Sequence, residues 1–385
     1  MPYFSNQMRE QAEILAPIFL KEKKMKCATA PEQRLEIETA KAIYQIQFGQ
    51  IQMEITGRCN MSCQHCRAAA EVPRDMPLEQ IIKIVQFARR YSPGYKEVIV
   101  SGGEPVLHRQ FFTVMKEIKK NGGESITLTT NGSLFTDKHL DLLEELAFKK
   151  CTLSVSLDSL KFEEHDAFRR FPGAYKKALA AIKLITKKCI PNVIGSARMT
   201  LKPEQIGEME KMAKFVFDLG CDRVSFSGIH PSGEARKHPE LWMNKKEKRQ
   251  FVENIINLRE KFPREFKIET NDPLFCLVRN KADIGSGNQI FFDGCGAGAI
   301  TFNVSANGDM TPCALLDISM MNVFSLSIDQ IAVAYQQNAF VQNMLDMNLT
   351  GKCGDCEKKY QCGGCRARAY ARNGDYLAED PDCWL

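Results

Sequence analysis

Hydrophobic and polar positions follow two alternating periods through the middle of the chain. Short β-rich runs recur from residue 48 onward, and the gaps between them carry apolar residues at helical spacing, as in Ala178, Ala181, Ile182 and Ile185. The predicted strands are residues 51–56, 97–101, 125–130, 152–158, 192–200 and 223–228. The predicted helices between and after them are residues 78–91, 110–121, 137–149, 174–188 and 204–219.

This alternation of strands and helices predicts an α/β fold. Strands that alternate with helices pair in parallel and are joined by right-handed crossovers. Six such units fall short of the eight of a closed TIM-type barrel. We therefore expect a partial (β/α)6 barrel over residues 48–240.

The flanking segments have a different character and suggest three further units. Residues 1–47 have apolar positions such as Leu35, Ile37 and Ile43, and are expected to form a helical lead-in. Residues 241–290 form a bridging region with one helix over 245–262. Residues 291–385 begin with a predicted hairpin that turns at Asn307-Gly308 and end in a polar, cysteine-dense tail, which indicates a small separate domain.

Composition narrows the class of protein. The chain has 385 residues, is 44% hydrophobic and carries a net charge of +5 with both signs mixed, which does not favour a nucleic-acid partner. The start of the chain lacks the pattern of a signal peptide, and no apolar run approaches the ~18 residues of a membrane span. We expect a cytoplasmic protein, in which 15 cysteines indicate metal thiolates rather than disulfides.

The first cysteine group lies directly after the first predicted strand, in the sequence GRCNMSCQHCRA. Cys59, Cys63 and Cys66 form a CxxxCxxC pattern, and three thiolates on one loop can hold three irons of a 4Fe–4S cube. The fourth iron is then free for another ligand. A structural zinc site, with His65 as the fourth ligand, is the alternative, but it would not explain the polar residues that follow the other strands.

Polar or glycine residues follow each predicted strand, where the chemistry of an α/β barrel collects. Glycine lets the backbone approach a ligand closely, and the polar side chains offer hydrogen bonds. In chain order these residues are Gly102, Gly103 and Glu104, then Asn131, then Ser156 and Asp158, then Arg198, then His230. One such residue would be an ordinary turn or cap, whereas a full set indicates a ligand site.

The CxxxCxxC loop, SGGEP, TTNG and SVSLDS, in this order, resemble the radical S-adenosylmethionine (radical SAM) superfamily over about residues 48–240. The resemblance implies an enzyme that cleaves S-adenosylmethionine reductively, with one electron from a donor such as flavodoxin or ferredoxin. The resulting 5′-deoxyadenosyl radical would abstract hydrogen from the substrate.

The same resemblance assigns roles to individual residues. It implies that Cys59, Cys63 and Cys66 bind the cluster, whose free iron chelates the amine and carboxylate of S-adenosylmethionine. The residues expected to contact that cofactor are Gly102, Gly103 and Glu104 at the amine, Asn131 and Ser156 at the carboxylate or ribose, Arg198 as a carboxylate partner and His65 beside the adenine.

The tail resembles the SPASM extension of these enzymes, which carries two auxiliary 4Fe–4S clusters. By position, one cluster would take Cys295, Cys313 and Cys365, and the other Cys353, Cys356, Cys362 and Cys383. The spacing in this chain is CxxC-x5-CxxC, with two residues before the last of these four cysteines. Many members of the family have three residues at that place. The first cluster lacks a fourth cysteine, which leaves Cys276, Asp293 or an open iron. A zinc ribbon is the alternative for the tail.

The tail motif is common to enzymes that modify ribosomally made peptides, enzymes that modify tetrapyrroles in heme or heme d1 biosynthesis, and enzymes of tungsten-cofactor maturation. We expect peptide modification by crosslinking, decarboxylation or epimerisation, with the other two as alternatives. A tetrapyrrole with propionates would need convergent cations. The candidates, each more readily interpreted as a solvated charge, are Arg169, Arg170, Arg236 and Lys237. A binding module without catalysis is disfavoured by the intact cysteine loop.

Overall fold

The computed structural model describes residues 34–68, 72–95, 97–279 and 294–385. Its main feature is a ten-stranded sheet in the order β12-β11-β10-β3-β4-β5-β6-β7-β8-β9. The strands are β3 (Gln50–Thr56), β4 (Glu97–Gly102), β5 (Ser125–Thr130), β6 (Lys150–Ser156), β7 (Val193–Leu201), β8 (Arg223–Gly228), β9 (Lys267–Thr270), β10 (Thr301–Val304), β11 (Asp309–Thr311) and β12 (Met321–Asn322).

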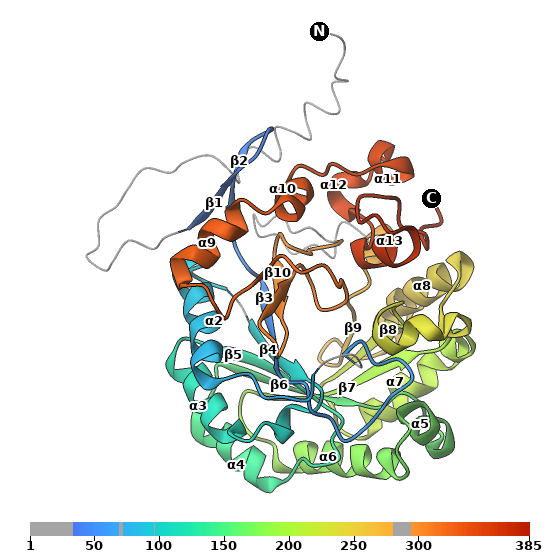
Figure 1. Cartoon of the computed structure of the whole chain (residues 1–385). Helices are drawn as coiled ribbons and strands as arrows, with labels where there is room; N and C mark the ends of the chain where they lie inside the picture. Colours follow the sequence, from blue (N-terminus) through green and yellow to red (C-terminus); the bar gives the residue numbers. More distant parts are fainter. Residues whose placement is uncertain (1–33, 69–71, 96, 280–293) are drawn as a thin grey trace.

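Helices connect the parallel strands in the predicted order. They are α2 (Leu78–Tyr91), α3 (Phe111–Lys120), α4 (Asp137–Leu146), α5 (Phe162–Arg169), α6 (Ala174–Lys188), α7 (Met209–Asp218) and α8 (Lys245–Lys261). Figure 1 shows helices α2 to α7 on the outer side of the curved sheet, with the orange and red C-terminal segments grouped at one end of it. The α/β partial barrel followed by a cysteine-rich region is confirmed.

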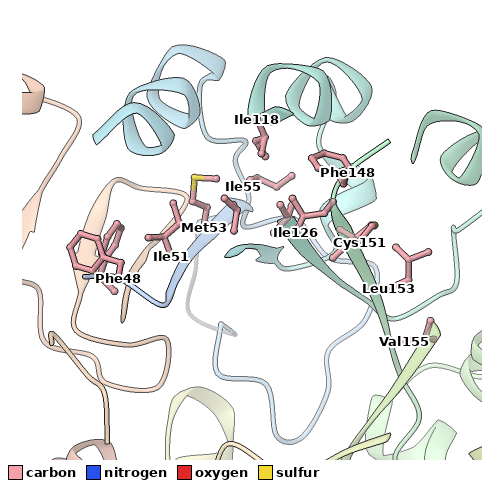
Figure 2. Close-up of a cluster of buried hydrophobic side chains, with 14 of the residues drawn as sticks. Phe48, Ile51, Met53, Ile55, Ile118, Ile126, Phe148, Cys151, Leu153 and Val155 are labelled. Carbon is pink, nitrogen blue, oxygen red and sulfur yellow. The ribbon is translucent and has the colours of Figure 1, made fainter. Parts of the chain in front are cut away.

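The two sheet faces differ in chemistry because successive side chains of a strand point to opposite faces. In β5 and β8, buried residues alternate strictly with half-buried ones. The buried set packs on the helices, as Figure 2 shows for Ile55 and Ile126 near Ile118 of α3. The opposite set is polar and lines the inside of the barrel, here called the lumen; its members include Thr127, Thr129, Ser156, Arg198, Ser225 and Ser227.

The sheet extends beyond the six predicted strands at both edges. Strand β9 lies within the predicted bridging region and pairs in parallel with β8. Strand β10 opens the C-terminal region and pairs in parallel with β3, so the two regions share one sheet. The predicted hairpin joins β10 to β11 through Asn307-Gly308, and Gly308 has the positive φ of 88° that such a turn favours.

The expected helix is wrong for the described part of the N-terminal lead-in. Strands β1 (Leu35–Glu38) and β2 (Ile43–Ile46) form an antiparallel hairpin. Leu35 and Ile37 are buried while Glu36 and Glu38 are exposed, a spacing of two residues that fits a strand. Residues 1–33 lie outside the described part of the chain.

The C-terminal region contains α9 (Ile328–Gln336), α10 (Ala339–Leu345), α11 (Gly351–Asp355), α12 (Lys359–Cys362) and α13 (Arg366–Asn373). Its buried apolar cluster is small, and two of its seven buried members are Cys295 and Cys365. A core of this size gives limited stabilisation, which agrees with a segment that depends on other bonds for its structure.

Replacing Phe226 by Ala should lower the free energy of unfolding by about 3–5 kcal/mol, because Phe226 is fully buried between β8 and the helices. Anaerobic urea unfolding followed by far-UV circular dichroism measures this change. The neighbouring Ser225→Ala substitution alters the lumen face and should change the same quantity by less than about 0.5 kcal/mol. Equal losses in the two variants would contradict the assignment of the two faces.

Candidate functional site

The cysteine loop after β3 is held by backbone contacts at both ends. Gly57 N–H donates to Arg74 O at 2.8 Å, and Gln64 N–H donates to Phe168 O at 3.0 Å. Cys59, Cys63 and Cys66 are free thiols. Burial, followed by the charges of Glu104 and the other two thiols, raises the pKa of Cys59 to about 11. The three thiols therefore face a common region, and a cationic metal centre there would ionise them.

The glycine pair after β4 lies in direct contact with the start of this loop. A Cβ on Gly102 would meet Thr56 O at 2.2 Å, and a Cβ on Gly103 would meet Arg58 O at 2.3 Å. Only glycine fits at such distances from backbone atoms. Glu104 N–H then donates to Arg58 O at 2.8 Å, which joins the loops after β3 and β4.

Glu104 is fully buried at this junction. Its carboxylate accepts bonds from Thr130 Oγ1 and from Asn131 N–H, each at 2.7 Å. Burial outweighs these bonds and raises its pKa to about 7. Asn131 also donates through its side chain to Asn60 Oδ1 at 3.0 Å, so the loops after β3, β4 and β5 form one network.

A buried ion pair lies on the other side of the cysteine loop. Arg169 Nη2 lies 2.6 Å from Asp158 Oδ2, and Arg169 Nη1 donates to Cys63 Sγ at 3.7 Å. Arg169 is thus an interior group beside the cysteines and not a solvated charge. The sequence suggested its charge but not this position, which depends on the packing of α5.

His65 and Arg198 occupy different surroundings within the barrel. The His65 ring stacks on Phe168 with centroids 4.2 Å apart, and burial lowers its pKa to about 3. Arg198 pairs in register with Ser156 on one side and Ser225 on the other. Burial, and then the charge of Arg67, lowers the pKa of Arg198. In the described ranges its guanidinium makes no hydrogen bond or ion pair, so it is available to an anion.

The other predicted propionate partners already have carboxylate partners. Arg170 pairs with Glu234 at 3.2 Å and Lys237 with the same residue at 2.8 Å. Arg236 pairs with Asp317 at 2.6 Å. Since all three lie at least partly in solvent, they are ordinary surface ion pairs.

The C-terminal cysteines lie in two neighbouring sets, which a hydrogen bond from Cys295 N–H to Cys362 O connects at 2.9 Å. In the first, Cys295 faces both Cys313 and Cys365, and burial followed by the charge of Cys295 raises the pKa of Cys313 to about 12. In the second, four cysteines line one pocket, namely Cys353, Cys356, Cys362 and Cys383. Among the described residues, no three His, Cys, Asp or Glu side chains converge to hold a single metal ion.

Several of these sulfurs accept hydrogen bonds from the backbone. Lys358 N–H donates to Cys356 Sγ, Gly364 N–H to Cys362 Sγ and Asp380 N–H to Cys353 Sγ, each at 3.4 Å. Hydrogen bonds to cysteine sulfur are among the features that tune iron–sulfur clusters. The donor set of the second group therefore fits a 4Fe–4S cluster.

Known proteins match this architecture along most of its length. Residues 53–216 match the family model of the Radical SAM superfamily. An AdoMet-dependent heme synthase of Methanosarcina barkeri is 30% identical over 350 residues, which cover 86% of this chain and 95% of the relative. The chain belongs to the radical SAM superfamily.

Two further proteins extend the comparison. The subtilosin biosynthesis protein AlbA of Bacillus subtilis is 26% identical, over 72% of this chain and 58% of its own length. The structure of Streptococcus suis SuiB bound to its precursor peptide SuiA has a TM-score of 0.68 at 16% identity, covering 89% of this chain and 77% of that one. At this identity the likeness to SuiB shows a shared fold.

Membership establishes the cofactors of the core. This radical SAM enzyme uses a 4Fe–4S cluster and S-adenosylmethionine, and the loop with three free thiols and an adjoining buried carboxylate fits both. None of the helices in the described ranges combines the length and apolar character needed to cross a membrane.

The affinity of this radical SAM enzyme for S-adenosylmethionine should fall as the pH drops through about 7. The Glu104 pKa is raised to about 7, so the side chain is a carboxylate above that pH and a neutral acid below it. The carboxylate is the stronger hydrogen-bond acceptor for the N–H groups of the methionyl amine. Anaerobic equilibrium dialysis of S-adenosylmethionine from about pH 6 to about pH 8 measures the effect.

The Glu104→Gln variant is the control for this titration, since its side chain keeps its shape but has no proton to exchange. It should bind more weakly, with an affinity independent of pH over the same range. A pH-dependent affinity that survives the substitution would assign the titration to another group.

Proposed function

We propose that this enzyme modifies a side chain of a propionate-bearing tetrapyrrole in heme formation. The observation that carries the proposal is the similarity to the Methanosarcina barkeri heme synthase, which extends over nearly the whole of that relative. Arg198 agrees with it, because a free guanidinium in a polar lumen suits a carboxylate. The sequence alone favoured peptide modification over tetrapyrrole modification, and this proposal reverses that order.

Peptide modification is the second candidate. It is favoured by the AlbA relative and by the fold shared with peptide-bound SuiB. The AlbA match covers a smaller share of both chains, and the SuiB likeness concerns the fold alone. The proposal therefore places the tetrapyrrole first.

In the proposed core site, Cys59, Cys63 and Cys66 hold the cluster. Gly102 and Gly103 let the backbone approach the methionyl amine, and Glu104 accepts its hydrogen bonds. Asn131 and Ser156 serve the ribose or carboxylate, and His65 packs beside the adenine. Arg198 is proposed to bind a substrate propionate, in place of the cofactor carboxylate expected from the sequence. When bound, the cluster and S-adenosylmethionine together supply a 5′-deoxyadenosyl radical that abstracts hydrogen from the substrate.

The chain contributes orientation and exclusion of water. The Asp158–Arg169 pair positions Cys63 through the 3.7 Å contact to its sulfur. The apolar stack of His65 and Phe168 covers one side of the loop. Buried side chains around the loop exclude water from a reactive centre.

The two C-terminal cysteine groups are proposed to hold auxiliary 4Fe–4S clusters. Cys295, Cys313 and Cys365 would hold the first, and the pocket of Cys353, Cys356, Cys362 and Cys383 would hold the second. An external one-electron donor such as flavodoxin or ferredoxin would reduce the enzyme.

Anaerobic reconstitution should give roughly 12 iron per chain, because three 4Fe–4S clusters are proposed. Replacing Cys59, Cys63 and Cys66 by Ala should reduce this to roughly 8 and abolish 5′-deoxyadenosine formation under dithionite. Replacing Cys189, an exposed thiol outside all three groups, should change neither quantity. A reconstituted chain with roughly 4 iron and stoichiometric zinc would contradict the tail assignment.

Iron coproporphyrin, a propionate-bearing tetrapyrrole, should stimulate 5′-deoxyadenosine formation and be converted to a product of different mass. Liquid chromatography with mass spectrometry measures both in one reaction. Its tetra-ester, in which no carboxylate can meet Arg198, is the matched control and should be inert. Stimulation by a short peptide encoded beside the gene, with none by the porphyrin, would support peptide modification instead.

A further inference from the structure

Four cationic side chains are buried in the described part of the chain. Three have carboxylate partners, in the pairs Arg169–Asp158, Lys248–Asp272 and Arg368–Asp272, at 2.6, 2.7 and 2.9 Å. The fourth is Arg366, with an exposed fraction of 0%. Within the described ranges its guanidinium forms hydrogen bonds but no ion pair. Because a buried charge without a counter-charge is strongly destabilising, this position requires an anion that is not a carboxylate.

The hydrogen bonds of Arg366 hold its guanidinium against the second cysteine group. Nη1 donates to Tyr376 O at 2.8 Å and to Ala378 O at 2.7 Å, which fixes the orientation of the group. Nη2 donates to Cys353 Sγ at 3.8 Å. Nε has no partner among the described residues. In that part of the chain, the Cys353 sulfur is therefore the one acceptor of Arg366 that can carry a negative charge.

Gly364 leaves the space in which the guanidinium meets this sulfur. A Cβ on Gly364 would meet Arg366 Nη2 at 2.6 Å and Cys353 Sγ at 3.3 Å. Its φ of +55° is also one that glycine adopts readily. Asp380 N–H donates to the same sulfur at 3.4 Å. Since hydrogen bonds from a cationic donor strengthen when the acceptor is ionised, this surrounding suits a thiolate better than a thiol.

Arg169 shows by contrast what is particular to Arg366. Arg169 Nη1 also donates to a cysteine sulfur, that of Cys63, at 3.7 Å. Its charge is offset by the Asp158 carboxylate at 2.6 Å. The contact at Cys353 has no such carboxylate within the described ranges, so the charge of Arg366 is left for the cysteine group itself.

We propose that Arg366 is the counter-charge of the auxiliary cluster held by Cys353, Cys356, Cys362 and Cys383, and that it raises the reduction potential of that cluster. This inference rests on the proposed presence of the cluster. Four thiolates outweigh the positive charge of a 4Fe–4S core, and reduction adds a further electron. A guanidinium at one ligand sulfur therefore stabilises the reduced form more than the oxidised form.

The test uses the full-length chain with the three cysteines of the core loop replaced by Ala, so that only the auxiliary clusters contribute. An anaerobic redox titration followed by electron paramagnetic resonance measures their reduction potentials. Arg366→Gln removes the charge and keeps an N–H donor. It should lower the ratio of reduced to oxidised cluster about tenfold at a fixed potential, which is about 59 mV for a one-electron couple. The affected potential should be absent when Cys356 and Cys383 are both replaced by Ala.

Two further variants separate charge from structure. Arg366→Lys keeps the charge but loses the fork of donors to the two carbonyl groups, and should keep both potentials close to those of the parent chain. Lys352→Gln removes an exposed charge next to Cys353, and should change neither potential because water screens it. A structural role for Arg366 predicts similar defects in its Gln and Lys variants and no shift of potential in the clusters that remain.

Unchanged potentials in Arg366→Gln, in a chain with roughly 8 iron, would overturn the role of Arg366 alone. If this variant instead loses iron, recovery of that iron in Arg366→Lys supports the counter-charge, and loss in both variants overturns it. A parent chain with only roughly 4 iron would show that one proposed auxiliary cluster is missing. That result would refute the proposed cluster assignment, and this inference with it.

Discussion

The guanidinium of Arg368 is the interaction on which the arrangement of the barrel and the C-terminal region depends. It donates to Asp272, directly after β9, at 2.9 and 3.2 Å, and to Asp380, near the end of the chain, at 3.0 and 2.7 Å. Lys248 of α8 completes the group through Asp272 at 2.7 Å. Buried charges cost several kcal/mol each unless every partner is present. The barrel edge and the tail must therefore assemble together.

This charge network contacts the C-terminal cysteines through two hydrogen bonds of Asp380. Asp380 accepts from the backbone of Cys365 and donates its own N–H to Cys353 Sγ, so one carboxylate residue contacts both C-terminal cysteine groups. Its pKa is held below its usual range by Arg368, against the opposing effect of burial. Arg368 keeps the Asp380 side chain ionised, and the carboxylate in turn holds the backbone of Cys365. The positions of the cysteines therefore depend on a charge network that cannot be predicted from the spacing of the cysteines.

The sequence predicted the parts of the structure that depend on local pattern. Strand and helix periodicity predicted β3 to β8 and the helices α2, α3, α4, α6 and α7 but missed α5, and Asn307-Gly308 predicted a hairpin. Prediction from the sequence failed where pairing between distant segments decides the structure. Leu35 and Ile37 were assigned to a helix although their spacing of two residues fits β1, and the parallel pairing of β10 with β3 joins residues about 250 positions apart in the chain.

The same distinction holds for the site. The motifs identified the cysteines and Glu104, because each occupies a short pattern with a definite chemistry. They could not identify which cations are free. Arg169, Arg170 and Arg236 were candidates for free cations, and only the packed structure shows that each has a carboxylate partner. Whether an arginine is available depends on what lies beside it in space.

Arg67 shows how the radical-generating loop and the tail are coupled. It directly follows Cys66, pairs with the buried carboxylate of Glu54 inside the barrel and donates to Ala314 O, beside Cys313, at 3.1 Å. A single side chain thus spans from the core cysteine loop to the first auxiliary group. Since Arg198 senses the charge of Arg67, the free cation of the lumen also lies near this bridge. A carboxylate bound by Arg198 would therefore lie close to Arg67 and to the cysteine loop that Arg67 follows.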